Sequence, residues 1–383
     1  MSPQQISMKQ VALLHFGPDV SARLVDDLLK IGSKSALIVT TPPIRDAAER
    51  VAGPLRAQGL RTEIWCDSGS EPSVSDFEAL LAIAQSRAAD AVIGIGGGSS
   101  MDLAKLAAAL MDGRQTIADV QRDGLSGPRR CWLACIPTTA GTGSEVSPIA
   151  ILLDENDLLK KGVVSEHLVP DAAYIDPMLT MSMPPAVTAA TGLDALTHCI
   201  EAYANRFAHP VIDTFALAGV RLVFRSLLNA VRNGSDVQAR TDMARASFYG
   251  GLCLGPVNTA AVHALAYPLG GEFHVAHGVS NAILLPHVLA FNLPAAEARY
   301  ADIAMAAGAD GNGTTAEIAR AGLRLIEGLC RDCGVLMRLS DHGVPADALD
   351  RMTDGAMTVT RLLDRNVRPV EWRDARQIYG AAF

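Results

Sequence analysis

The chain has 383 residues, which suits two domains rather than one, and its 49% apolar content can support sizeable cores. A formal net charge of −8 argues against a nucleic-acid partner or an anionic membrane, and no apolar run approaches the length of a membrane span. The seven cysteines, an odd number without a paired pattern, indicate reduced thiols, so we expect a cytoplasmic protein.

Strand-like and helix-like segments alternate through the first half of the chain. Strands are predicted at 35–40 and 61–66, and helices at 44–58 and 76–87. A further strand at 91–95 leads through a glycine-rich turn into a helix that starts at Met101. This order indicates a parallel sheet with helices on its faces, which binds ligands at the carboxyl ends of its strands.

The second half of the chain has a different character. Beyond Met183-Pro184-Pro185 strand-like runs nearly vanish, and Ala/Leu-rich helical patterns dominate, such as 211–229 and 295–308. The polar, glycine-rich stretch 308–315 is predicted to be a surface loop that ends in a helix cap. We therefore expect two domains, 1–186 and 187–383.

Two stretches in the first half are typical of anion-binding loops. The turn Gly96-Gly97-Gly98-Ser99 follows a buried strand and precedes a helix, so backbone N–H groups and the helix dipole can meet a phosphate. It matches neither G-x-G-x-x-G nor a Walker loop. The stretch 136–145, IPTTAGTGSE, follows the apolar run WLACI and predicts a second ligand-facing junction, with a plain Ser/Thr turn as the alternative.

Four residues of the second half form a candidate metal site. Asp194 and His198 stand four residues apart in an apolar segment free of proline, which places both on one face of a helix. His263 and His277 flank a Pro-Leu-Gly-Gly break that lets the chain turn back. Three imidazole nitrogens and one carboxylate oxygen suit Fe(II) or Zn(II). The alternative is ordinary histidines, since the chain has nine.

The ordered motifs GGGSSMDLAK, PTTAGTGSEV, DALTHCIEAYAN and HALAYPLGG…HVAHG together resemble the iron-containing (group III) alcohol dehydrogenase family. The resemblance covers nearly the whole chain. It implies a Rossmann-like α/β domain, which binds NAD or NADP, followed by an all-helical metal-binding domain, with metal and nicotinamide meeting in a cleft. The implied reaction is hydride transfer between a small alcohol and the nicotinamide, with the metal polarising the alcohol or carbonyl oxygen. A homodimer joined through N-terminal strands is also implied.

The resemblance assigns roles to further residues. Three residues and an aspartate in the following helix would cradle the pyrophosphate: Gly97, Gly98, Ser99 and Asp102. Three threonines would line the nicotinamide side: Thr138, Thr139 and Thr142. A family lysine near the cofactor corresponds to Lys160 or Lys161, for which a solvated loop pair is the alternative.

Two positions depart from the family pattern. Tyr267 stands where many members carry a histidine close to the nicotinamide, so either Tyr267 or His274 is the candidate proton relay. Thr41 stands where NAD-preferring members have aspartate, whose carboxylate binds the ribose hydroxyls and repels a 2′-phosphate.

Three other functions compete with this interpretation. Maleylacetate reductases of the same superfamily work without a metal, but their pattern lacks the aspartate that is present here as Asp194. Dehydroquinate synthases have a related architecture, but their basic phosphate-binding residues are not apparent. A non-catalytic nucleotide-binding protein would not need an intact metal set. The predicted pocket residues Phe248, Leu252, Leu254 and Val257 are apolar, which favours a small neutral alcohol over a charged sugar.

Overall fold

The computed structural model describes residues 5–69, 71–156 and 159–383. These residues form two compact units. The first half of the chain, 9–139 with 143–182, makes a sheet unit. Residues 183–383 make a helical unit, which also includes 5–8 and the short segment 140–142. The units divide at Ser182 and Met183, close to the Met-Pro-Pro punctuation from which the sequence boundary at 186 is predicted.

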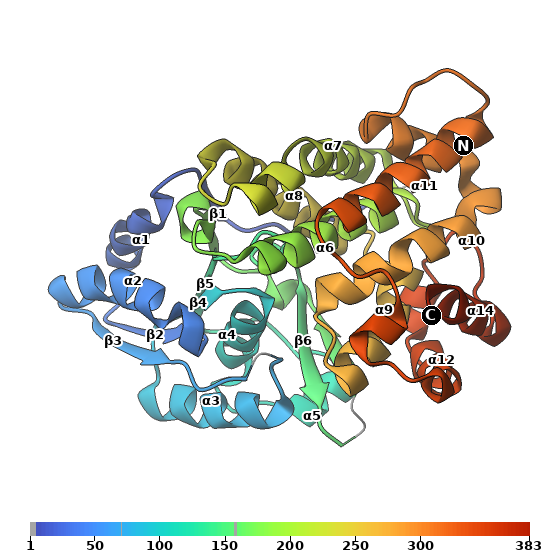
Figure 1. Ribbon diagram of the computed structural model, residues 1–383. Helices are drawn as coiled ribbons and strands as arrows, with labels where there is room; N and C mark the ends of the chain where they lie inside the picture. The colour runs from blue at the N-terminus through green and yellow to red at the C-terminus, as the bar shows by residue number, and fades with distance from the viewer. Residues whose placement is uncertain (1–4, 70, 157–158) are drawn as a thin grey trace. The chain divides into compact units, whose positions relative to one another are not determined.

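A parallel sheet forms the centre of the sheet unit (Figure 1). In the described residues it has six strands in the order β1-β8-β5-β4-β2-β3, and every neighbouring pair runs parallel. Their bounds are β1 Leu13–Phe16, β2 Ser35–Val39, β3 Arg61–Trp65, β4 Ala91–Gly96, β5 Trp132–Pro137 and β8 Ala172–Ile175. The predicted parallel α/β architecture is confirmed.

Helices cover both faces of this sheet because its central strands are apolar on both sides. Leu37 and Val39 of β2 pack towards α3 (Val74–Arg87), α4 (Gly98–Leu110) and α5 (Ile117–Asp123). The alternate residues Ala36 and Ile38 pack towards α1 (Leu24–Lys30) and α2 (Arg45–Ala57). Helix α4 begins at Gly98, earlier than the predicted start at Met101. Gly97 is its N-cap residue, so these two glycines of the motif form the N-terminus of the helix.

A two-stranded antiparallel hairpin was not predicted. Strands β6 (Ile149–Asp154) and β7 (Leu159–Val164) pair with each other, and Ala150, Leu152 and Val163 join the α3–α4 core. The predicted basic pair at 160–161 therefore lies on a strand, and the loop alternative for it is wrong.

The helical unit is built from nine helices in its described residues, and the all-helical prediction is confirmed (Figure 1). Their bounds are α6 Pro185–Tyr203, α7 Pro210–Arg232, α8 Val237–Leu254, α9 Ala261–Phe273, α10 His277–Ala306, α11 Thr315–Asp332, α12 Leu349–Met357, α13 Thr360–Leu363 and α14 Trp372–Ala382. Short 3-10 turns across the described chain are η1 Val20–Arg23, η2 Pro42–Ile44, η3 Glu166–Leu168, η4 Pro177–Thr180, η5 Leu339–His342 and η6 Ala346–Ala348. The predicted loop 308–315 ends in a capping box between Thr314 and Glu317, as expected.

The longest helix, α10, contains a local break. Ala296 leaves helical geometry (φ −144°, ψ 34°) two residues after Pro294, so the helical pattern predicted from 295 is the part beyond this kink. The helix is long and apolar enough to cross a membrane, which corrects the expectation that no such run exists. Within the described chain 56% of its most apolar window is buried, as in the core helix of a globular unit.

Glycines allow the central helices to pack closely. A Cβ added at Gly278, the second residue of α10, would overlap the backbone carbonyl of Ala190 on α6. A Cβ at Gly219 of α7 would overlap the Cys199 thiol, and one at Gly250 of α8 would lie 3.2 Å from the His198 Cβ. Backbones of α7, α8 and α10 thus approach α6 closely, which fixes the helix that carries Asp194 and His198.

Candidate metal centre and nucleotide pocket

Helix α6 presents Asp194 and His198 on one face, as the four-residue spacing predicts. Both side chains are buried, and the His198 Nε2 lies 3.6 Å from the Asp194 Oδ1. The apolar residues on either side, Leu193 and Ala195, are fully buried. The acid and the imidazole therefore project inside the helical unit and away from water.

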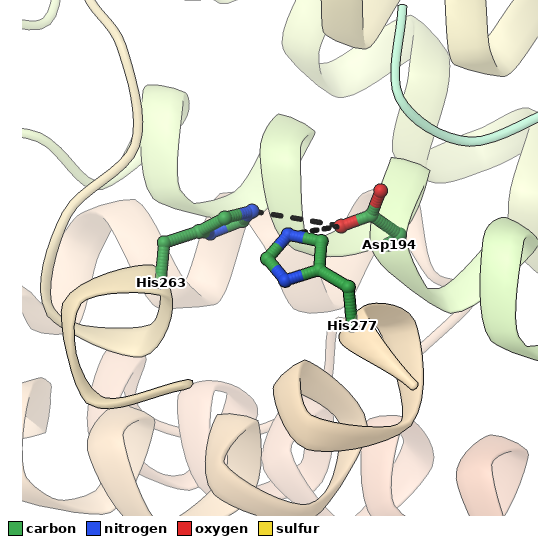
Figure 2. Close-up of side chains that lie close together, drawn as sticks. All are labelled: Asp194, His263 and His277. Carbon is green, nitrogen blue, oxygen red and sulfur yellow. Dashed lines mark ion pairs between the residues drawn. The ribbon is translucent and has the colours of Figure 1, made fainter. Parts of the chain in front are cut away.

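The other two predicted ligands come from helices α9 and α10. His263 lies in the first turn of α9 and His277 is the first residue of α10. Their Nε2 atoms lie 3.5 Å and 3.6 Å from the Asp194 Oδ1, and the ligand atoms of these three residues lie within 4.8 Å of one another. Figure 2 shows the three side chains pointing towards a common centre. The fourth predicted ligand, His198, lies outside this group of three but beside it, since its ring stacks on that of His263 with centroids 4.8 Å apart.

Hydrogen bonds at the outer ring nitrogens orient two of these imidazoles. The His198 Nδ1 donates to the Gly141 carbonyl at 3.2 Å, and the His263 Nδ1 lies 2.5 Å from the Glu201 Oε2. A proton on Nδ1 leaves the Nε2 lone pair free to point at the common centre. This is the arrangement in which histidine binds a metal.

The charge balance of the centre favours a cation. Burial alone would raise the pKa of Asp194, but the three imidazoles outweigh it and hold that pKa well below its usual range. Burial lowers the pKa of His198. Burial also opposes the charge of His263, yet the Glu201 and Asp194 carboxylates prevail and raise its pKa to about 9. The Asp194 and Glu201 carboxylates thus favour positive charge at His263.

Sequence reasoning missed two residues of this centre, Glu201 and Asn281. The Asn281 Nδ2 donates to the Asp194 Oδ1 at 2.8 Å and lies 3.2 Å and 3.4 Å from the Nε2 atoms of His263 and His277. Its Oδ1 is buried without a partner among the described atoms. Helical spacing could have identified Asn281 from the sequence, because it follows His277 by four residues and so lies on the same face of a helix.

The donor set fits one transition-metal ion. Three imidazole nitrogens and a carboxylate oxygen are the ligands that Fe(II) and Zn(II) accept, whereas Mg(II) and Ca(II) prefer oxygen. The His277 side chain is 27% exposed, and the other three are at most 6% exposed. The centre is therefore closed around Asp194 and more open at His277, as a site that admits substrate requires.

The structure separates the two candidate proton-relay residues. Tyr267 of α9 is buried, with its ring centroid 6.4 Å from that of His277. His274 is exposed at the end of α9 in the left-handed conformation (φ 55°), a position that usually terminates a helix. Of the two, Tyr267 lies beside the ligand set.

The sheet unit contains a cavity of about 480 Å³ at the carboxyl ends of its strands. Its walls are Thr41, Pro42, Pro43, Ile44, Ser68, Gly69, Gly97, Ser99, Ser100, Thr138 and Thr139. Three of these side chains are at least nine-tenths buried and carry hydroxyls that have no partner among the described atoms: Ser68, Ser100 and Thr138. Unpartnered buried hydroxyls around a cavity indicate a polar ligand.

Glycine geometry opens this cavity beside the N-terminus of α4. Gly96 has φ 149°, and a Cβ there would overlap the Ser100 side chain. A Cβ at Gly97 would lie 3.5 Å from the Thr139 side chain, which would narrow the cavity. The N-terminus of α4 is thus accessible to an anion.

Asp102 does not line this cavity, although the sequence motif places it with the cofactor residues. Its buried carboxylate accepts hydrogen bonds from the Ser144 hydroxyl at 2.5 Å and the Ile151 N–H at 2.9 Å. Lys105, one turn on, is fully buried, and its ammonium donates to the Ser144 hydroxyl, the Ser147 carbonyl and the Ile149 carbonyl at 2.8–3.0 Å. Through these hydrogen bonds Asp102 and Lys105 hold residues 144–151 against α4.

The remaining predicted cofactor residues are Lys160 and Lys161 on β7 and Thr142 in the segment 140–142. Lys160 is 7% exposed and pairs with Glu71 at 2.7 Å, whereas Lys161 is 38% exposed and pairs with Asp154. Lys160 is therefore the more enclosed of the two. Thr142 is half-buried in the segment 140–142, which belongs to the helical unit.

Arg45 follows the cavity-lining Ile44 in the chain. Its Nη1 donates to the Cys66 Sγ at 2.9 Å, and Cys66 is two residues from the cavity-lining Ser68. A thiol is a weak acceptor, so this exposed guanidinium keeps donors for a stronger one. Thr41 itself lines the cavity.

Known proteins resemble the chain over nearly its whole length. The family model described as iron-containing alcohol dehydrogenase matches residues 12–177, and the model for the C-terminal part of the Fe-containing alcohol dehydrogenase family matches 188–383. Long-chain-alcohol dehydrogenase 1 of Geobacillus thermodenitrificans is 43% identical, with 97% of this chain and 95% of the relative covered. The 1,3-propanediol dehydrogenase of Klebsiella pneumoniae is 36% identical, with 89% and 90% covered.

Solved structures share the fold as well. A 1,3-propanediol oxidoreductase has a TM-score of 0.95 and 32% identity, with 99% of this chain and 100% of that chain covered. A sulfoacetaldehyde reductase of Bifidobacterium kashiwanohense, solved in complex with NAD⁺, has a TM-score of 0.89 and 26% identity, with 99% of both chains covered.

Proposed function

Because this chain belongs to the iron-containing alcohol dehydrogenase family, we propose that one divalent metal is held by four side chains: Asp194, His198, His263 and His277. The protein is an oxidoreductase of the alcohol dehydrogenase class. The observation that carries the proposal is the convergence of three imidazole Nε2 atoms within 3.6 Å of the Asp194 Oδ1. The donor set suits Fe(II) and Zn(II), and the family favours Fe(II) as the first choice.

When bound, the metal polarises the alcohol or carbonyl oxygen, and the nicotinamide accepts or returns hydride. The residues of the chain do the rest. Asp194 supplies the one negative ligand, and its burial keeps water from screening that charge. Tyr267, buried beside His277, is our candidate to pass the alcohol proton outward; His274, exposed at the end of α9, is the other.

For the cofactor we propose NAD or NADP bound in the cavity of the sheet unit. Gly97, Gly98 and Ser99 would cradle the pyrophosphate at the start of α4. Thr138, Thr139 and Thr142 would line the nicotinamide side. The burial of Lys160 supports it over Lys161 as the cofactor lysine. For Asp102 the contacts with Ser144 and Ile151 favour an indirect role, in which it shapes the cofactor loop.

The substrate we propose is a small neutral alcohol or the matching aldehyde. Leu252, Leu254 and Val257, three of the predicted pocket residues, are buried and apolar, and Phe248 is half-buried. The relatives named above act on a long-chain alcohol and on 1,3-propanediol, so the family covers alcohols of different length. We further propose a cytoplasmic homodimer, on the strength of the family and of the reduced cysteines, all of which are free.

Replacement of a single ligand tests the metal assignment. The change His277→Ala should remove bound metal and most alcohol-dependent NAD(P)H formation, because a ligand at the open side of the centre is lost. His342→Ala is the matched control, since His342 is a half-buried histidine outside the centre that contacts the Leu336 carbonyl. Metal content by elemental analysis and turnover with a panel of alcohols are measured on both. Retention of metal and rate in His277→Ala would show that the assignment is wrong.

A further inference from the structure

Glu201 is a buried carboxylate with two hydrogen-bond partners on another helix. It lies on α6, is 4% exposed, and follows His198 by three residues. Its Oε2 lies 2.5 Å from the His263 Nδ1, and its Oε1 accepts the Val262 N–H at 2.6 Å. Both partners belong to the first turn of α9, which begins at Ala261.

We propose that Glu201 is a positioning residue of the metal centre, which acts through His263. This inference rests on the proposed function, in which the His263 Nε2 binds the metal. Two donors face Glu201, the Val262 N–H and the His263 Nδ1–H, and only a carboxylate offers each its own acceptor oxygen. The carboxylate therefore fixes the proton of His263 on Nδ1 and leaves the Nε2 lone pair for the metal.

The negative charge of Glu201 also favours a bound metal ion. Asp194 and Glu201 are two negative charges in the buried interior of the helical unit, and the imidazoles between them are neutral when they bind metal. One divalent ion balances both carboxylates. A buried site without net charge avoids the cost of an uncompensated ion in a medium of low dielectric constant.

A purely structural role for Glu201 makes a different prediction. The N-cap residue of α9, Ala260, has no capping side chain, so Glu201 also serves as the anion at this helix start. If capping were its whole role, loss of the charge would lower stability and leave metal affinity unchanged. Metal affinity and stability must therefore be measured separately.

The variant Glu201→Gln distinguishes the two roles because it keeps the shape and removes one acceptor. Glutamine has one amide oxygen, so it can serve either Val262 or His263. If it serves Val262, its NH₂ faces the His263 Nδ1 and drives the ring proton to Nε2, where it blocks the metal. We expect Zn(II) and Co(II) to bind about 10–100-fold more weakly, as measured by competition with a chromophoric chelator. The visible spectrum of the Co(II) form should also shift.

Asp242→Asn is the matched control. Asp242 is a buried carboxylate of the same unit, 2% exposed, whose partners are Arg225, Ser226 and Gln238. Its replacement should lower the melting temperature of chelator-treated protein and leave metal affinity within about twofold of wild type. Unchanged metal affinity and an unchanged Co(II) spectrum in Glu201→Gln would overturn the proposal.

A measurement on the wild type keeps the proposal testable if Glu201→Gln does not fold. In the Zn(II)-loaded protein, imidazole ¹⁵N NMR should find the His263 proton on Nδ1 and the metal on Nε2. Binding through Nδ1 would overturn the role of Glu201 and leave the metal site itself in place. Failure of the proposed function would be recognised differently, because the wild-type protein would then bind no metal at all.

Discussion

We propose that Thr41 faces the adenosine end of the proposed cofactor. It lines the cavity of the sheet unit, two residues after the end of strand β2, and carries no charge to repel a 2′-phosphate. Arg45, one helical turn on, has its guanidinium on the weak acceptor Cys66. We therefore expect dual use of NAD and NADP, or a modest preference.

A carboxylate at this position should restore selection for NAD. In Thr41→Asp two like charges at ~4 Å repel by ~4 kcal/mol at an effective dielectric constant near 20, and solvent trims this to ~1–2 kcal/mol, or about tenfold or more in binding. Steady-state kinetics with both cofactors measure the shift, and Thr41→Asn is the uncharged control. A wild-type preference for NAD above about a thousandfold would mean that another residue controls the choice.

Glu145 makes folding stability depend on pH. Its side chain is 1% exposed, its Oε2 has no partner among the described atoms, and burial raises its pKa to about 7 although Lys105 opposes the shift. Between the unfolded pKa near 4.5 and the folded pKa the native state holds the extra proton, so stability falls as pH rises through that interval.

The variant Glu145→Gln isolates this contribution. Its stability relative to wild type should rise between about pH 4.5 and about pH 7 and then level, with a total change on the order of 3 kcal/mol. Urea unfolding of both proteins across that range gives the difference directly, and shared effects of other groups cancel. A difference that does not change with pH would contradict the assignment.

The residue pattern identified the four candidate ligands, which the structure places close together, but not the residues that support them. Asp194 and His198 are one turn apart, so helical spacing alone joins them. Glu201 could not be joined to His263 in this way, because 62 residues separate them and only the packing of α9 against α6 makes the contact. For Asp102 the motif identified the right region, but no pattern in one sequence shows whether a carboxylate turns towards a cavity or away from it.

At the scale of elements, the crossing of α6 and α10 requires a glycine. The variant Gly278→Ala should lose about 1–3 kcal/mol or more, because the added methyl group overlaps the Ala190 backbone and cannot be relieved by a side-chain rotation. Bound metal should fall too, since the neighbouring residue is His277. Denaturant midpoints and metal content are the readouts.

Gly328→Ala provides the opposite expectation within the same unit. A Cβ at Gly328 of α11 meets nothing within 4 Å, so alanine should stabilise the helix by about 0.5–1 kcal/mol. Equal tolerance of both substitutions would show that α6 and α10 do not pack this closely in solution.

Periodicity predicted β2, β3, β4, α2, α3 and α4, because β2 and β4 are continuous apolar runs and α2 is amphipathic. It did not predict β1, β8, α1 or α5. It missed the hairpin of β6 and β7, since β7 is polar at Lys160 and Lys161 and only Val163 of its residues is buried. It placed one helix near 295 where the chain has a single long helix with a kink at Ala296, because prolines obscure the continuity of such a helix.

At the scale of the whole molecule, the proposed homodimer has a direct test. The edge strand β1 pairs with β8 in the described sheet, and Leu14 on it is 41% exposed. An exposed edge of this kind commonly pairs or is covered. Sedimentation equilibrium at micromolar concentration should give twice the mass of one chain, and a single-chain mass at every concentration would refute the dimer.

The chain passes between the two units more than once, and this has a consequence for dissecting the protein. Residues 140–142 belong to the helical unit although they lie within the sequence of the sheet unit. From there Gly141 supplies the carbonyl that holds the His198 Nδ1. A fragment cut at Met183 would keep all four proposed metal ligands in its sequence and still lack this carbonyl. The proposed metal-binding module is therefore discontinuous in the gene, and recombining family members at the apparent domain boundary would exchange one of its parts.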